Sequence, residues 1–271
     1  MRVGIIGGGT IARLALDHVR RGQLGKTRVV ALLGRNEASP GKQLARRYRV
    51  RFVTSLEALL ALEPDVVVEA ASHEAVREHG AAVLGAGVDL IVLSAGALCD
   101  DALRARLERA ARRSGALLYV PSGGIGGLDA LKAARLAGVQ EVRIAVAKPP
   151  AAWKGVAHVE RLGVDLGSLR EPLTLYEGPA RKGVALFPAN VNIAAVLSLA
   201  GVGFERTRLK VVADPALRFN THLISIRART GTISVKLENV PAPENPKTAW
   251  LACYSALAAL AAARSPVRYG T

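Results

Sequence analysis

A glycine-rich run near the N-terminus has the residue types and spacing to bind phosphates. Gly7, Gly9 and Ala12 match a G-x-G-x-x-G/A pattern that follows an apolar run and opens a stretch with helical spacing. Gly7 permits a tight turn, Gly9 lets a pyrophosphate approach the backbone, and Ala12 lets the helix lie against the strand. The N–H groups of Thr10 and Ile11, at the helix start, then face the phosphates. The run predicts a dinucleotide site, and the alternative is a strand-to-helix turn without a ligand.

A histidine in the second half is the candidate for proton transfer. His222 lies in the segment DPALRFNTH, where a turn is followed by the start of a predicted strand. Such a position can aim an imidazole into a cleft, and histidine suits proton transfer near neutral pH. The spacing alone does not separate a catalytic histidine from a structural one whose hydrogen bonds are satisfied.

The residues after the second predicted strand bear on the choice of cofactor. Residues 27–33 form that strand, and Arg35 and Asn36 follow it, where a dinucleotide-binding unit meets the adenosine ribose. A carboxylate there bonds the ribose 2′-hydroxyl, whereas an arginine accommodates a 2′-phosphate. The first acid is Glu37, so the pattern favours NADP, or the use of both NADP and NAD. Alternatively, Arg35 is only a surface residue, and Asn36 can still bond a hydroxyl.

Two further strands end in small residues. The apolar run at 65–71 leads into Ala71 and Ser72, and the run at 88–93 is followed by Ser94 and Ala95. Continuous apolar runs are typical of parallel strands buried on both faces. We expect these four residues to lie beside the cofactor.

The order of elements predicts an α/β protein with two domains. Alternating strands and helices over residues 1–123 indicate a Rossmann-type, doubly wound parallel sheet. Residues 124–245 indicate a second α+β domain with a mixed or antiparallel sheet, used for substrate binding, catalysis and oligomerisation. Residues 246–271 are predicted to form a helix that returns to the first domain, with Asn245 as its N-cap.

Composition excludes several classes of protein. The chain has 271 residues and a formal net charge of +15, but its arginines are dispersed and aromatic residues make up only 4%. A nucleic-acid platform needs aromatic side chains between basic ones, so the charge favours small anionic substrates instead. Apolar runs stay below the roughly 18–20 residues that span a bilayer. The cysteines, Cys99 and Cys253, match no metal-ligand spacing and suit a reducing compartment. We expect a cytoplasmic protein without a metal site and without a membrane or nucleic-acid partner.

Four segments of the second half are more distinctive than the glycine pattern. They read PSGGIGGLDAL, FPANVNIAAVLSLAGVGFERTRLKVVADP, RFNTHLISI and LENVPAPENPKTAW, and the GGGTIA opening and the SAGAL loop accompany them. Together they resemble the L-aspartate dehydrogenase family over nearly the whole chain. The resemblance implies NAD(P)-dependent oxidative deamination of L-aspartate to iminoaspartate, which hydrolyses to oxaloacetate and ammonia and can feed NAD biosynthesis. It also implies a homo-oligomer, commonly a homodimer.

The resemblance also implies roles for particular residues. The catalytic histidine of the family falls on His222, and its cofactor-contacting asparagine falls on Asn192. Its backbone contact to the cofactor falls on Gly124 or Gly126. His222 would remove a proton from the substrate amine or activate the water that attacks the imine.

The two carboxylates of aspartate need cationic or amide partners. Lys247 and Thr248 are candidates because they lie at the expected start of the last helix, where anions are favoured. Ordinary helix capping is the alternative for both residues.

Two other functions remain open at this point. One is a different oxidoreductase on the same scaffold, of the homoserine dehydrogenase or dihydrodipicolinate reductase type, because a fold does not determine a substrate. The other is a protein that senses a dinucleotide without catalysis.

Overall fold

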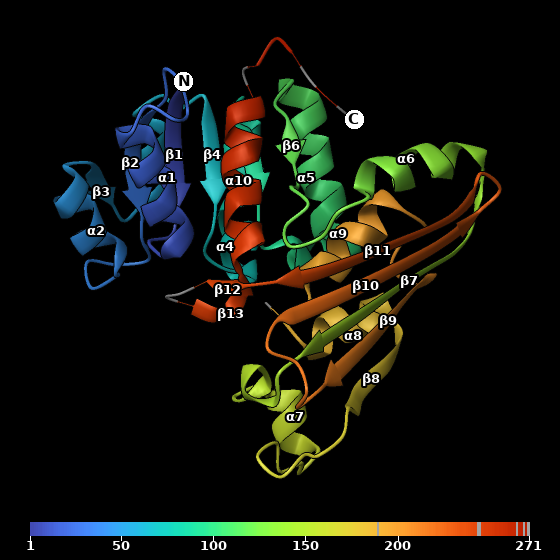
Figure 1. Cartoon of the computed structure of the whole chain (residues 1–271). Helices are drawn as coiled ribbons and strands as arrows, with labels where there is room; N and C mark the ends of the chain where they lie inside the picture. The colour runs from blue at the N-terminus through green and yellow to red at the C-terminus, as the bar shows by residue number, and fades with distance from the viewer. Residues whose placement is uncertain (189, 243–244, 264, 268, 270–271) are drawn as a thin grey trace. The chain divides into compact units, whose positions relative to one another are not determined.

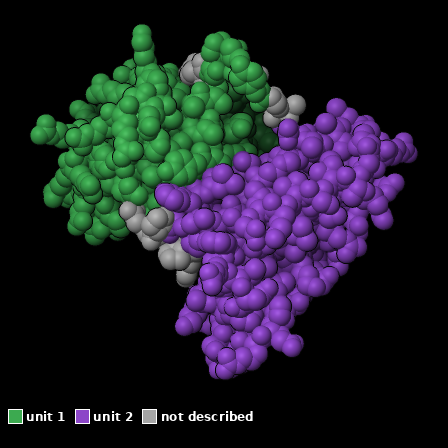
Figure 2. Space-filling model, in the orientation of Figure 1, with its two compact units in different colours: residues 1–121, 253–269 green, residues 122–252, 270–271 purple. Residues whose placement is uncertain are grey.

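The computed structural model describes the chain except residues 189, 243–244, 264, 268 and 270–271. The described chain divides into two compact units, coloured green and purple in Figure 2. Unit 1 contains residues 1–121 and 253–269, and unit 2 contains residues 122–252.

Unit 1 is built on a six-stranded sheet in which all neighbouring strands are parallel, in the order β3-β2-β1-β4-β5-β6 (Figure 1). The strands are β1 (Arg2–Ile6), β2 (Arg28–Leu33), β3 (Arg51–Val53), β4 (Val66–Glu69), β5 (Asp89–Val92) and β6 (Leu118–Tyr119). This confirms the predicted Rossmann-type sheet. The strand order reverses between β1 and β4, and ligands of such sheets bind at the carboxyl ends of the strands beside that reversal.

Helices connect the strands of this sheet, and three of them begin at a side-chain cap. They are α1 (Thr10–Arg20), α2 (Gly41–Tyr48), α3 (Leu56–Leu60), α4 (His73–Gly85) and α5 (Asp101–Ser114), with a 3₁₀ turn η1 (Ala95–Cys99) before α5. Ser55, Ser72 and Asp100 are side-chain N-caps of α3, α4 and α5. Each accepts a hydrogen bond from a backbone N–H that has no partner within the helix.

The last helix begins later than the sequence predicts. Residues Asn245–Ala249 form strand β13, which pairs antiparallel with β12 (Pro241–Ala242), and α10 spans Trp250–Ala262. The prediction of a helix from residue 246 is therefore wrong at its start, because cross-strand pairing takes the backbone that Asn245 was expected to cap. From Cys253 onward α10 belongs to unit 1, and Tyr254 packs edge-to-face on His18 of α1, with ring centroids 5.6 Å apart.

Unit 2 contains a mixed five-stranded sheet in the order β11-β10-β7-β9-β8, in which only β7 and β9 run parallel. Its strands are β7 (Val139–Lys148), β8 (Leu173–Pro179), β9 (Thr207–Ala213), β10 (Asn220–Ala228) and β11 (Gly231–Asn239). This confirms the predicted second domain with a mixed sheet.

Helices of unit 2 lie against one face of its sheet, as Figure 1 shows for α8 and α9. The helices are α6 (Leu128–Ala137), α7 (Ala157–Arg161), α8 (Ala180–Leu186) and α9 (Asn192–Ala200), with a 3₁₀ turn η2 (Pro150–Trp153). Side chains of β7 alternate, so that Ile144 and Val146 are buried while Arg143 is exposed. Lys148, at the end of the strand, falls on the buried side of this alternation. No helix in the described part of the chain has the length and apolar character that crossing a bilayer requires.

Candidate functional site

The turn after β1 requires glycine at its first position. Gly7 has a φ of +112°, and a Cβ there would stand 2.7 Å from the carbonyl oxygen of Ala70, which follows β4. The N–H of Gly7 donates to the carbonyl of Leu33 at the end of β2, at 2.9 Å. The ends of three strands therefore converge on this turn, where only glycine fits.

The start of α1 is suited to an anion. Gly9 is the N-cap, and α1, which is described along its whole length, has neither a side-chain cap nor an acidic residue in its first turn. A Cβ on Gly9 would meet no atom within 4 Å, so the space beside it is open. The N–H groups of Thr10 and Ile11 lie in this first turn, and a phosphate there would meet free donors and the positive end of the helix dipole. The residues present fit a dinucleotide.

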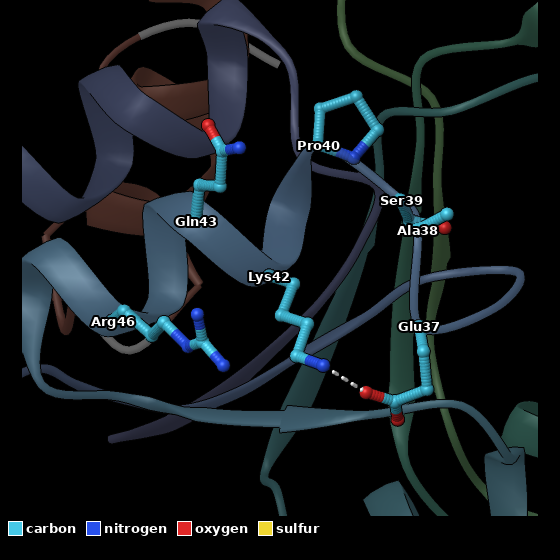
Figure 3. Close-up of a pocket in the computed structure, with 7 residues that line it drawn as sticks. All are labelled: Glu37, Ala38, Ser39, Pro40, Lys42, Gln43 and Arg46. Carbon is cyan, nitrogen blue, oxygen red and sulfur yellow. Dashed lines mark ion pairs between the residues drawn. The ribbon is translucent and has the colours of Figure 1, made fainter.

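The segment after β2 is exposed and basic. Arg35 and Asn36 are both exposed, and the Asn36 Oδ1 accepts from the N–H of Ala38 at 3.0 Å. A surface hollow of about 390 Å³ follows, in which Lys42 Nζ lies 2.5 Å from a carboxylate oxygen of Glu37 (Figure 3). Glu37, Ala38, Ser39, Pro40, Lys42, Gln43 and Arg46 line the hollow.

A buried carboxylate that the sequence analysis missed links the ends of β4 and β5. Glu69 is 1% exposed, and its Oε1 accepts from the N–H groups of Ala71 and Ser72 at 2.8 and 2.9 Å. Its Oε2 accepts from the N–H of Ser94, and its Oε1 from the Ser94 hydroxyl, both at 2.9 Å. Burial raises the pKa of this carboxyl, and the four hydrogen bonds oppose that shift.

Glu69 therefore holds together the small residues that were predicted to line the cofactor. Ala71 and Ser72 lie directly after β4, and Ser94 precedes the buried Ala95 of η1. The signal that could have revealed the role of Glu69 is a carboxylate near the end of the apolar run at 65–71. Such a residue is seldom buried unless it is paired or fully hydrogen-bonded.

Unit 2 has its own cluster of buried polar side chains. Lys148, Asn220, His222 and Asn239 are each at most 5% exposed. Asn220 pairs with Asn239 across β10 and β11, and His222 pairs with Val146 of β7. The register of the sheet therefore places these side chains together at one end of its helix-covered face.

The hydrogen bonds of His222 assign its proton. Nδ1 lies 3.0 Å from the carbonyl oxygen of Gly124 and 3.1 Å from the Nδ2 of Asn239. Because the carbonyl can only accept, the tautomer with the proton on Nδ1 is the one that gives this oxygen a hydrogen bond from the ring. The Asn239 Nδ2 donates to the same carbonyl at 2.9 Å. The Nε2 lone pair is left free, and this buried atom has no partner in the described part of the chain. Burial, and then the charge of Lys148, lower the pKa of His222 to about 4, although the bond to Gly124 opposes the shift. The imidazole is thus a neutral base at pH 7.

The buried imidazole predicts a pH-dependent stability. Below pH 6.5 an unfolded chain protonates this histidine, while the folded chain does not until about pH 4. Stability therefore falls as the pH drops through this window, by about 3 kcal/mol for the full shift. Urea unfolding of the wild type and of His222→Gln at pH 7 and at pH 4.5 measures the contribution of His222. The two proteins should differ in the size of their loss, and equal losses would contradict the assignment.

The remaining predicted residues fall as follows. Gly124 is buried against His222, with a virtual Cβ 3.6 Å from the imidazole Cε1, whereas Gly126 faces Val235. Asn192 is half-buried and opens α9. Lys247 and Thr248 lie in strand β13, so the helix-terminus argument for them is wrong, and the Lys247 side chain lies outside the described residues. No group of three or more metal-ligating side chains occurs among the described residues.

A doubly wound sheet with a glycine turn suited to a phosphate, joined to a second unit that carries a buried neutral histidine, is typical of a two-domain dehydrogenase dependent on a nicotinamide dinucleotide. The family profile described as "Homoserine dehydrogenase, NAD binding domain" matches residues 7–121, and "Aspartate dehydrogenase, C-terminal" matches residues 129–263. The chain belongs to the aspartate dehydrogenase family.

Individual relatives agree over the full length. The chain is 40% identical to an L-aspartate dehydrogenase of Methanosarcina barkeri, with 100% of both chains covered. It is 45% identical to L-aspartate dehydrogenase 2 of Bordetella pertussis, with 96% of this chain and 95% of that one covered. Among solved structures, the aspartate dehydrogenase of Thermotoga maritima matches with a TM-score of 0.77 and 31% identity, covering 100% of this chain and 99% of that one.

Proposed function

We propose that this chain is an NAD(P)-dependent L-aspartate dehydrogenase. It oxidises L-aspartate to iminoaspartate, which hydrolyses to oxaloacetate and ammonia, or it runs the reverse reductive amination. The observation that carries the proposal is His222, whose buried Nε2 is unpaired among the described residues while Nδ1 is held by Gly124. The names of the relatives at 40% and 45% identity support the substrate.

The side chains of unit 2 supply the acid–base part of this reaction. A nicotinamide cofactor, when bound, would supply the acceptor for the hydride from Cα of the substrate. The substrate amine must be neutral, so that its nitrogen lone pair can form the C=N bond as the hydride leaves Cα. The neutral imidazole of His222 can take the proton of the amine at Nε2. After that proton has passed to solvent, the same atom can take a proton from the water that attacks the imine. Gly124 and Asn239 keep the imidazole in the tautomer that both steps need.

The test of this function is direct. Purified protein is mixed with oxaloacetate, ammonia and either NADH or NADPH, and the absorbance of the reduced nicotinamide is followed. Its consumption, dependent on both oxaloacetate and ammonia, supports the proposal. Activity on a semialdehyde or a cyclic imine instead would assign one of the other oxidoreductases. Tight cofactor binding without turnover of any of these compounds would indicate a sensor.

We propose that the dinucleotide binds along the carboxyl edge of the sheet in unit 1. The proposed contacts are Gly7, Gly9, Thr10, Ile11, Ala12, Arg35, Asn36, Ala71, Ser72, Ser94 and Ala95. The geometry of Gly7 and Gly9 and the uncapped start of α1 support the phosphate end of this set. The contacts of Asn192 and of Gly124 with the cofactor, which the family resemblance implies, stay predictions.

We propose further that both cofactors are used and that NADP is preferred. Arg35 is exposed directly after β2, and the nearest acid, Glu37, is paired with Lys42. The neighbouring hollow also contains Arg46, so cations outnumber the acid beside the expected ribose (Figure 3). A 2′-phosphate is favoured by such a field, whereas a 2′-hydroxyl gains little from it.

Replacing Arg35 by alanine is expected to raise the KM for NADPH about 10-fold or more, because a charge-assisted hydrogen bond to the phosphate is lost. The KM for NADH should change little. Initial rates with each cofactor give the ratio. Arg28→Ala is the matched control, since Arg28 is exposed at the start of β2, at the opposite end of the same strand. Equal effects of Arg35→Ala on both cofactors would argue against the NADP preference.

We also propose that the protein works in the cytoplasm as a homodimer. The family resemblance supports the dimer, and Cys99 and Cys253, which form no disulfide, suit a reducing compartment. Sedimentation velocity at micromolar concentration tests the dimer, and a single species with the mass of one chain would contradict it.

A further inference from the structure

Lys148 is a buried cation without a counter-ion in the described structure. Its side chain is 3% exposed at the end of β7, on the helix-covered face of the sheet. Its Nζ donates to the backbone carbonyl of Asn190 at 3.2 Å and lies 5.1 Å from the centroid of the Trp153 ring. None of the ion pairs formed by the described residues includes it. A lysine of this kind is costly to keep charged, and burial lowers its pKa to about 8.

The atoms around Lys148 include several that lack partners. Among the described residues, the buried polar atoms without a hydrogen bond are the Oδ1 of Asn190, the Nδ2 of Asn220 and the Nε2 of His222. Each of these atoms belongs to a residue that the structure links to Lys148. The backbone carbonyl of Asn190 accepts a hydrogen bond from Lys148. Asn220 and Lys148 are the next residues beyond the Thr221–Ala147 pair of β10 and β7, so they lie level in the sheet. The charge of Lys148 lowers the pKa of His222. Buried polar groups without partners are rare in folded proteins, and a cluster of them calls for an explanation.

The three unpaired atoms and Lys148 Nζ are of two kinds. Lys148 Nζ, which has two more N–H groups besides the one that it gives to Asn190, and Asn220 Nδ2 are donors, and the former is cationic, so they match a carboxylate. Asn190 Oδ1 and His222 Nε2 are acceptors, so they match an amine or a water molecule. An α-amino acid presents a carboxylate and an amine on one carbon, and aspartate adds a second carboxylate.

We propose that Lys148, assisted by the side-chain amide of Asn220, binds a carboxylate of the substrate and thereby places the substrate amine at His222 Nε2. This inference rests on the proposed function and names the group that recognises its acidic substrate. Binding supplies the counter-ion that Lys148 lacks and satisfies the donor of Asn220. Neither Lys247 nor Thr248 is needed for this role.

The experiment compares three variants of the full-length protein with the wild type. Lys148→Met removes the charge while keeping the length and apolar stem, and Lys148→Arg keeps the charge. Lys210→Met is the control, because Lys210 lies on the neighbouring strand β9, with its side chain 44% exposed and paired with Glu177 at 3.4 Å. Calorimetry measures the binding of succinate, a four-carbon dicarboxylate that cannot react, in the presence of saturating oxidised cofactor. Initial rates give the KM for oxaloacetate, and thermal unfolding gives Tm.

Lys148→Met should weaken succinate binding and raise the KM for oxaloacetate by about 100-fold, the scale of a charged hydrogen bond made in a desolvated site. Lys148→Arg should recover much of this loss, and Lys210→Met should match the wild type. The Tm of Lys148→Met should stay the same or rise, because a buried lysine without a counter-ion does not stabilise the fold. A lysine with a merely structural role would instead lower Tm and leave KM unchanged.

The outcomes separate this inference from the proposed function. Wild-type succinate affinity and KM in Lys148→Met would overturn the carboxylate contact even if aspartate dehydrogenase activity is found. Lysine-dependent succinate binding without turnover of oxaloacetate would keep the anion site and reject the substrate assignment. Pyruvate as a second substrate identifies the carboxylate. An equal loss for pyruvate and oxaloacetate indicates the α-carboxylate, and a loss confined to oxaloacetate indicates the distal one.

Discussion

Replacing His222 by alanine is expected to lower kcat for reductive amination of oxaloacetate by about 1,000-fold, within the range of a lost general base. The residue is 3% exposed, and its Nε2, which has no hydrogen-bond partner among the described residues, is the atom that we propose transfers the proton. The imidazole is neutral because burial and the charge of Lys148 lower its pKa to about 4. Steady-state rates at pH 8 with saturating cofactor measure the effect.

The matched control for this variant is His79→Gln, because His79 lies on α4 in unit 1 and its nearest charged partner is Glu78. It should keep wild-type kcat. Affinity of His222→Ala for the reduced cofactor, followed by nicotinamide fluorescence, should stay within a few-fold of the wild type, because the turn proposed to bind the phosphates belongs to unit 1. A kcat for His222→Ala within about 10-fold of the wild type would reject His222 as the base.

The second large effect is expected at Glu69. Its replacement by alanine should lower the free energy of unfolding by about 3 kcal/mol, because the N–H groups of Ala71, Ser72 and Ser94 lose their acceptor. Glu69→Gln has the same shape but turns an amide NH₂ toward some of these donors, so it should also be destabilised. Urea unfolding followed by circular dichroism gives both values.

The prediction for Glu69 extends to cofactor binding and is compared with a variant of an exposed glutamate. Both Glu69 variants should also bind the cofactor more weakly, since the loops after β4 and β5 are held by this carboxylate. Glu57→Ala is the control, because Glu57 is exposed on α3. Stability of Glu69→Ala within 0.5 kcal/mol of the wild type, a bound typical of neutral surface changes, would show that the four hydrogen bonds contribute little.

Local sequence signals determined much of the architecture. The apolar runs at β1, β4 and β5 with intervening helical spacing predict a parallel sheet, because strands buried on both faces must be continuously apolar. The turn at Gly7 is equally local, since its φ of +112° is open only to glycine without strain. The switch to alternating strands in the second half likewise predicts the mixed sheet of β7 to β11. The resemblance in four segments then predicts the family.

Tertiary structure decided which side chains meet. Glu69 lies in an apolar run and was missed, because its acceptors are filled by backbone groups that include one 25 residues away. The cluster around His222 joins residues from β7, β10 and β11 and the carbonyl of Gly124, 98 residues before the histidine. At the last helix, Asn245 and Pro246 have the local pattern of a helix start, yet cross-strand pairing with residues 241–242 makes a strand instead. In each case the deciding interaction is a hydrogen bond between segments distant along the chain or paired across a turn. Propensities within one short window contain no information about such a bond until the register of the sheet is established.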